Sequence, residues 1–113
     1  MSELLEKMTN LSISERLDRQ KKWSKGIISL APELRTKLHP YVEDIVVRLR
    51  AERGLSEIEA ITITSQGNPI YKVDKLLDYI KTKDHWVPEL FCSVLNEIGQ
   101  ALCSDALRRR AGL

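Results

Sequence analysis

The side chains that could act as nucleophiles, proton carriers or metal ligands are few and scattered. The candidates are His39, His85, Cys92 and Cys103. A thiol nucleophile needs a base within hydrogen-bonding reach, and a structural zinc site needs closely spaced cysteine or histidine pairs. Neither pattern is present, and although His85 could approach a cysteine in the folded chain, Cys92 belongs to an apolar helical stripe. We therefore expect no enzymatic activity, no small-molecule substrate, no cofactor and no metal, and two buried, reduced thiols.

The other side chains that could take part in binding are the charged residues, which are unevenly distributed along the chain. The 113-residue chain has a net charge of +2, but residues 27–107 hold 12 acidic and 9 basic residues and are therefore negative. The flanks are basic, because residues 1–26 contribute +2 and Arg108, Arg109 and Arg110 add +3. A charge cluster at a terminus is typical of a solvated tail.

Length and composition fit one compact globular domain. Apolar residues make up 42% and aromatic residues only 5%, which favours aliphatic packing between helices. No apolar run approaches the roughly 20 residues of a membrane helix, and the N-terminus lacks the apolar segment of a signal peptide. This combination favours the cytosol or nucleus, and we expect a cytoplasmic protein.

The most regular apolar spacing lies between Pro69 and Leu107. It predicts a helix that begins at Pro69, a second helix that ends at Gly99, and a short third helix. The second helix has one apolar face, formed by Leu90, Phe91, Val94, Leu95 and Ile98. None of the three helices can bury its stripe alone, so we expect them to pack together.

The first third of the chain predicts a long, bent helical region. Residues 2–11 have a weak helical pattern, and Ser12 with Glu15 has the spacing of a capping box that begins a helix. Pro32 is expected to interrupt this region, because proline lacks the N–H that an interior helical position requires. The bent helix should end at His39 and Pro40.

Two further helices are expected between residues 40 and 64. The first has apolar residues on one side and ends at Gly54. The second begins at a capping box of Ser56 and Glu59, and Ile58 and Ile61 are expected to point inward. Residues 60–64 are rich in β-branched side chains, so an extended stretch is an alternative there.

These elements predict an all-α fold, a six-helix antiparallel bundle with a kinked first helix. The predicted divisions are an N-terminal, helical extension (1–26), the bundle (27–107) and a basic C-terminal tail (108–113). The apolar positions of the helices predict the core, which comprises Leu34, Leu38, Ile45, Leu49, Ile61, Val73, Leu76, Leu77, Ile80, Phe91, Leu95, Ile98, Leu102 and Leu107.

The order of these features from Leu30 to Leu107 resembles a caspase recruitment domain of the death-fold superfamily. The resemblance is carried by the kinked first helix, YVEDIV, GLSEIE, KVDKLLDYIKTKD and ELFCSVLNEIGQALCSDAL, and it covers about 80 residues. It implies a death fold with Greek-key helical topology. It also implies binding to other caspase recruitment domains, recruitment of an adaptor, kinase or caspase in innate-immune or apoptotic signalling, and assembly into helical oligomers.

The resemblance also implies which residues make contact. Asp44, Glu57 and Glu59 fall where sensor proteins, such as apoptotic-protease-activating factor and the NOD-like receptors, carry an acidic patch. The matching basic patch is poorer, because Ala31 and Asp74 stand where caspase-type partners carry arginines. The neighbouring substitutes are Arg35, Lys37, Lys72 and Lys75. We therefore expect a sensor or receptor domain that presents its acidic patch to a basic adaptor.

A second contact is expected at the turn that contains Lys83, Asp84 and Trp86. The Trp86 indole could cap the core or protrude as a contact anchor, and both alternatives stay open. Trp23 lies outside the family pattern and is expected to pin the N-terminal helix onto the bundle.

One stretch of the sequence also has a pattern seen in nucleic-acid-binding domains. Residues 50–80 superficially resemble a helix-turn-helix, so a small nucleic-acid-binding domain is the alternative. The negative charge of residues 27–107 and the aspartates Asp74 and Asp78 between the lysines of the would-be recognition helix argue against it. Another death-fold subfamily would keep the interaction role and change the partner.

Overall fold

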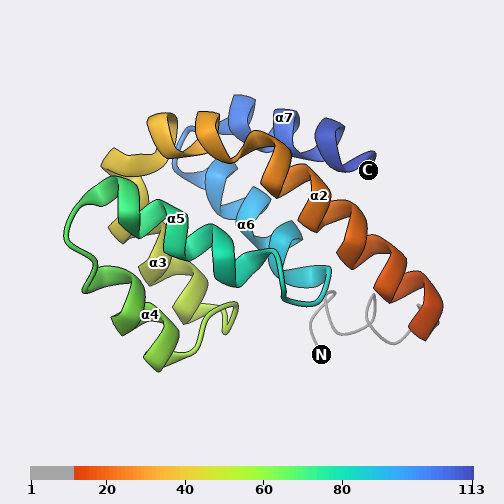
Figure 1. Cartoon of the computed structure of the whole chain (residues 1–113), viewed down its shortest axis with the longest axis horizontal. Helices are drawn as coiled ribbons and strands as arrows, with labels where there is room; N and C mark the ends of the chain where they lie inside the picture. Colours follow the sequence, from red (N-terminus) through yellow and green to blue (C-terminus); the bar gives the residue numbers. More distant parts are fainter. Residues whose placement is uncertain (1–11) are drawn as a thin grey trace.

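The structure, a computed structural model, describes residues 12–113, in which all regular structure is helical (Figure 1). This confirms the predicted all-α class. The weak helical pattern of residues 2–11 lies outside the described residues. The elements are α2 (Ile13–Leu38), the 3-10 helix η1 (His39–Tyr41), α3 (Val42–Ala51), α4 (Glu57–Thr64), α5 (Pro69–Ile80), α6 (Trp86–Glu97) and α7 (Ala101–Ala111).

Helix α2 begins where its cap predicts and continues farther than expected. The Ser12 hydroxyl accepts a hydrogen bond from the Glu15 N–H at 3.1 Å. The helix then runs through Pro32 to Leu38, so the interruption expected at this proline is not found. Pro32 and Ile28 both lie on the exposed side, where water can satisfy the Ile28 carbonyl that the missing N–H leaves free.

The connection from α3 to α4 depends on two adjacent residues. Arg53 adopts a left-handed conformation with φ of 64°, and the Gly54 N–H donates to the Leu49 carbonyl at 2.7 Å, which ends α3. A Cβ on Gly54 would lie 2.9 Å from Leu90 Cδ2 and 3.3 Å from the Leu49 carbonyl oxygen, so a larger residue there requires the Leu90 side chain to shift. Helix α4 then extends through residues 60–64, so the alternative of an extended stretch is wrong.

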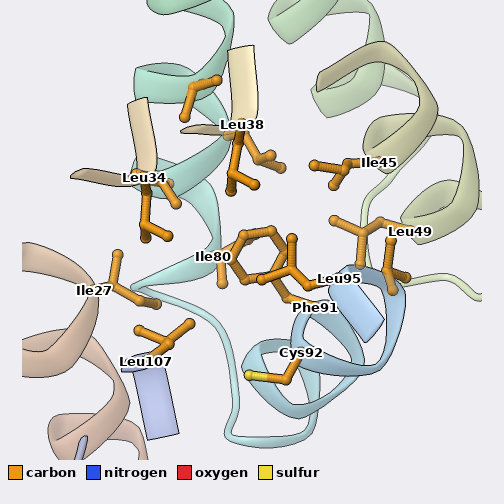
Figure 2. Close-up of a cluster of buried hydrophobic side chains, with 14 of the residues drawn as sticks. Ile27, Leu34, Leu38, Ile45, Leu49, Ile80, Phe91, Cys92, Leu95 and Leu107 are labelled. Carbon is orange, nitrogen blue, oxygen red and sulfur yellow. The ribbon is translucent and has the colours of Figure 1, made fainter. Parts of the chain in front are cut away.

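The core surrounds helix α6. Figure 2 shows Phe91 enclosed by side chains from α2, α3, α5 and α7. Predicted core residues that are buried are Leu34, Leu38, Ile45, Leu49, Val73, Leu76, Leu77, Ile80, Phe91, Leu95 and Leu107. Ile98 is half-buried against the core.

Two predicted core positions are wrong, and a third residue expected to point inward is also exposed. Ile61 is 58% exposed, Ile58 is 76% exposed, and Leu102 is 79% exposed. Helix α4 instead turns Ala60 and Ile63 inward, and two helical residues of separation place Ile61 on the side opposite Ile63. Helix α7 faces the bundle with Cys103, Ser104, Leu107 and Ala111.

The ends of the described chain are joined to the bundle. Helix α2 spans the predicted division between residues 26 and 27, and Trp23 is buried. The arginines expected after the last helix lie within its last turn instead. The guanidinium of Arg108 lies 5.8 Å from the centre of the Trp23 ring, and a Cβ on Gly26 would lie 2.9 Å from the Ala111 nitrogen. Trp23 therefore fastens the first half of α2 to α7.

Candidate interaction surface

The three residues of the predicted acidic patch lie on neighbouring helices, Asp44 on α3 and Glu57 and Glu59 in the first turn of α4. Asp44 Oδ1 accepts from Arg48 Nε at 3.0 Å, with 52% of its side chain exposed. Glu57 Oε1 lies 3.5 Å from Arg50 Nη2, and 71% of its side chain is exposed. Both carboxylates are therefore open to a partner.

Glu59 has a structural role, because its carboxylate caps helix α4 and pairs with Lys83. Its Oε1 accepts hydrogen bonds from the Ser56 N–H at 2.9 Å and from Lys83 Nζ at 2.8 Å, which completes the predicted capping box. Desolvation raises the pKa of this carboxyl, but the hydrogen bonds from Lys83 and Ser56 outweigh it, and the pKa lies below its usual value. Glu59 is therefore largely occupied within the chain.

The predicted basic patch lies on α2 and α5, which pack against each other. Arg35 forms an ion pair with Asp74, and Lys72 Nζ donates to Glu43 Oε1 at 2.7 Å. Lys75 Nζ lies 5.4 Å from the centre of the Tyr79 ring. Among residues 12–113, Lys37 has no carboxylate partner within 4 Å. Two of the four cations thus have a carboxylate partner at short range, and Lys37 and Lys75 have none within the described chain.

The turn of the predicted second contact is covered by α2. Asp84 forms an ion pair with Arg16, and Gln20 Nε2 donates to the Thr82 carbonyl at 2.8 Å. Desolvation raises the pKa of the Asp84 carboxyl, but the Arg16 hydrogen bond helps to lower it below its usual value. Trp86 is half-buried against the core, which fits the capping alternative better than a protruding anchor.

His85 is the most unusual polar group of the described chain. Its ring is fully buried, and neither ring nitrogen has a hydrogen bond to residues 12–113. Nδ1 lies 3.9 Å from Glu89 Oε1, and Nε2 lies 4.0 Å from Asp84 Oδ1. Two carboxylates therefore lie about 4 Å from the ring nitrogens, and Glu89 is in turn 3.6 Å from Arg19.

The environment of the two thiols disfavours the reactive thiolate form. Cys92 and Cys103 are buried and are not joined in a disulfide, and burial raises the pKa of both, which disfavours the reactive thiolate. Within residues 12–113, histidine, cysteine and carboxylate side chains do not gather into a group of three that could hold a metal ion.

Some ion pairs of the predicted site residues can be predicted from the sequence, and others cannot. Asp44 and Arg48 are four residues apart in a helix, a spacing that predicts their ion pair. The contacts of Arg16 with Asp84 and of Lys83 with Glu59 join positions 68 and 24 residues apart. These contacts follow from packing between helices, which no local pattern reveals.

Comparison with models of protein families, with curated proteins and with solved structures finds no match. The resemblance to caspase recruitment domains stays a prediction. Over residues 12–113, no helix combines the length and the apolar content that a membrane span requires.

Proposed function

We propose that this chain is a protein interaction module of the caspase recruitment type. Its elements would correspond to the six-helix, Greek-key death fold, with the C-terminal half of α2, which continues through Pro32 without a break, in the place of the kinked first helix. Its partners would be other caspase recruitment domains, including further copies of itself. It would act in the cytoplasm, recruiting an adaptor, kinase or caspase to an innate-immune or apoptotic signalling complex.

The observation that supports this proposal is the exposed pair of carboxylates on adjacent helices. Asp44 and Glu57 project from α3 and α4 with more than half of each side chain in contact with solvent. Opposed charges at an interface set orientation and association rate more than affinity. A basic partner would therefore be oriented by this face and released when salt screens it.

Assembly of many copies would supply the binding affinity that a single contact between two domains lacks. Each exposed ion pair contributes roughly 0 to 1 kcal/mol. When many domains are brought together, later contacts become effectively intramolecular and weak contacts add up to strong attachment. Nucleated helical oligomers are thus the expected active form.

The test is light scattering over a range of protein concentrations, with negative-stain imaging, at low and high salt. We expect salt-sensitive oligomers in the wild type and their loss in Asp44→Lys, with a melting temperature only slightly lowered, because the exposed ion pair of Asp44 with Arg48 contributes at most about 1 kcal/mol. The matched control is Asp105→Lys, which makes the same charge change at an exposed position on α7. Oligomers that persist in Asp44→Lys at low salt would exclude the acidic patch as the contact.

The nucleic-acid alternative is not favoured by the charges of α5. Lys72 pairs with Glu43 at 2.7 Å, and Lys81 Nζ lies 3.1 Å from Asp78 Oδ1. Lysines already paired with carboxylates release few counterions from a phosphate backbone, so this helix would bind nucleic acid weakly.

A further inference from the structure

Helix α2 exposes aliphatic side chains along one side. Ile13 is 75% exposed, Leu17 is 52% exposed and Ile28 is 59% exposed. At about 100° per residue, these positions lie within about 60° of one another around the helix and extend over about 22 Å of its length. A surface helix ordinarily presents polar residues to water, and grouped apolar side chains on a surface mark a site of interaction.

Unpaired cations border this aliphatic row. Lys21 and Lys25 line a shallow depression of about 410 Å³ beside Ile28. At the end of α7, Arg110 Nη1 donates to the Ser29 hydroxyl at 2.7 Å, which brings a third cation to the same side of α2. Within the described chain, neither lysine nor Arg110 forms an ion pair with a carboxylate.

The carboxylates of the same stretch of α2 do not balance these cations. Asp18 lies on this side of the helix, and its Oδ2 is 3.5 Å from Lys22 Nζ. Glu15 is the other carboxylate between residues 13 and 29. It lies about 160° around the helix from Leu17, which places it on the opposite side.

The neighbouring carboxylates of α5 are paired as well. Asp74 and Asp78 line a depression beside Ile28. Asp74 forms an ion pair with Arg35, and Asp78 Oδ1 lies 3.1 Å from Lys81 Nζ. These pairs carry no net charge, so the unpaired cations leave the outer face of α2 positive.

The position of α2 in the molecule makes this face accessible. In Figure 1, α2 runs along one margin of the bundle, and its first half extends to an end of the longest dimension. Its inner side packs on α5 and α7, whereas Lys21, Lys25 and Ile28 are exposed. A large, flat partner can therefore reach the face without any change in the bundle.

Such a partner must accept aliphatic side chains and carry negative charge. The surface of an anionic lipid bilayer offers both, because helices with lysine beside leucine or isoleucine lie in its interfacial plane with the apolar side chains immersed by roughly 5 to 10 Å. Each lysine or arginine near that surface strengthens binding roughly fivefold. A nucleic acid would match the cations alone and leave Leu17 and Ile28 in water.

We propose that the outer face of α2 docks on a bilayer that contains anionic phospholipid. The face comprises Ile13, Leu17, Lys21, Lys25 and Ile28. Its aliphatic side chains enter the boundary between headgroups and acyl chains, and its lysines, with Arg110, meet the anionic headgroups. The contact goes beyond the proposed function and does not depend on it, because none of these residues belongs to the predicted acidic patch, basic patch or second contact.

The test is co-sedimentation of the full chain with vesicles, made either of phosphatidylcholine alone or of phosphatidylcholine and phosphatidylserine in equal amounts. The charge variant carries Lys21→Gln and Lys25→Gln, and the aliphatic variant carries Leu17→Gln and Ile28→Gln. All four side chains are exposed, so both variants should keep the circular dichroism spectrum of the wild type.

Each variant has a matched control at another exposed surface. Lys37→Gln with Arg53→Gln removes the same charge from exposed residues that have no carboxylate partner among residues 12–113. Ile58→Gln with Ile61→Gln replaces two exposed isoleucines of α4. Both controls leave the outer face of α2 intact.

We expect the wild type and both controls to sediment with the anionic vesicles at low salt and to stay in solution with phosphatidylcholine alone. The charge variant should bind at least tenfold more weakly, because two lysines together correspond to roughly 25-fold. The aliphatic variant should also bind at least tenfold more weakly, because its glutamines cannot enter the acyl boundary. High salt should weaken the binding of the wild type.

Other outcomes would overturn the membrane contact. A wild type that stays in solution with anionic vesicles at low salt excludes it, as does equal binding by the α2 variants and their controls. Binding that is weakened in the charge variant alone would show adsorption by charge without insertion, and would also refute it. A wild type that ignores vesicles but binds a DNA duplex, with binding lost in the charge variant, would identify nucleic acid as the occupant. Salt-sensitive oligomers without vesicle binding would leave the proposed function standing and refute only this contact.

Discussion

Arg53→Gly should stabilise the protein, because residue 53 holds the only left-handed conformation of a non-glycine residue between residues 12 and 113. This conformation costs an L-residue roughly 1 to 2 kcal/mol, and the extra freedom that glycine loses on folding costs about 0.5 to 1 kcal/mol. The Arg53 side chain is exposed and has no ion pair or side-chain hydrogen bond within the described residues, so its removal sacrifices no contact. The midpoints of these two ranges differ by about 0.75 kcal/mol, so the expected gain in the free energy of unfolding is about 0.5 to 1 kcal/mol.

Thermal and urea unfolding would measure this gain, which corresponds to a rise of about 2 to 8 °C in melting temperature for a domain of this size. Gly54→Ala is the informative contrast. Residue 54 has no positive φ, but its Cβ would lie 2.9 Å from Leu90 Cδ2, so overpacking should destabilise the protein by about 1 to 3 kcal/mol. A melting temperature that stays the same or falls in Arg53→Gly would refute the assignment of conformational strain to Arg53.

Two further perturbations test the core and the contact between α2 and the turn after α5. Leu95→Ala removes a fully buried side chain beside Phe91 (Figure 2) and should cost about 2 to 5 kcal/mol in chemical denaturation; an unchanged midpoint would show that α6 is not central. The pKa of Asp84 is lowered in the folded state, so its contribution to stability is complete above the unfolded pKa of about 3.9 and is lost as pH falls through the folded value. As pH falls through that range, the free energy of unfolding should therefore decrease less in Asp84→Asn than in the wild type. If the free energy of unfolding of the two proteins instead changes in parallel below pH 4, the ion pair of Asp84 with Arg16 is contradicted.

Local patterns predicted the helices best where one face alone is apolar. The stripe of Leu90, Phe91, Val94 and Leu95 is buried throughout, and the caps at Ser12 and Ser56 begin helices where expected. Such features depend on residues three or four positions apart, which the sequence displays directly.

The same reasoning failed where two faces compete or where contacts join distant segments. Helix α4 offers Ile58 and Ile61 on one side and Ile63 on the other, and only packing against α3 and α5 decides which side is buried. The sequence predicted that the residues of the acidic patch lie on neighbouring helices. It did not predict that Lys83 forms an ion pair with Glu59, or that Arg16 of α2 forms one with Asp84, because these contacts depend on tertiary structure. A surface residue's availability therefore cannot be predicted from its type and position alone.

The long helix α2 has a consequence for how the molecule opens. At about 1.5 Å per residue, its 26 residues extend roughly 39 Å, close to the 40 Å longest dimension of the described chain. From Ile13 to Lys22 it buries no side chain and is held by Arg16, Arg19 and Gln20, whereas Trp23 and later residues enter the core. A single continuous helix thus has two local stabilities, and unwinding that starts at its first turn can stop at Trp23 while the rest of the bundle stays folded.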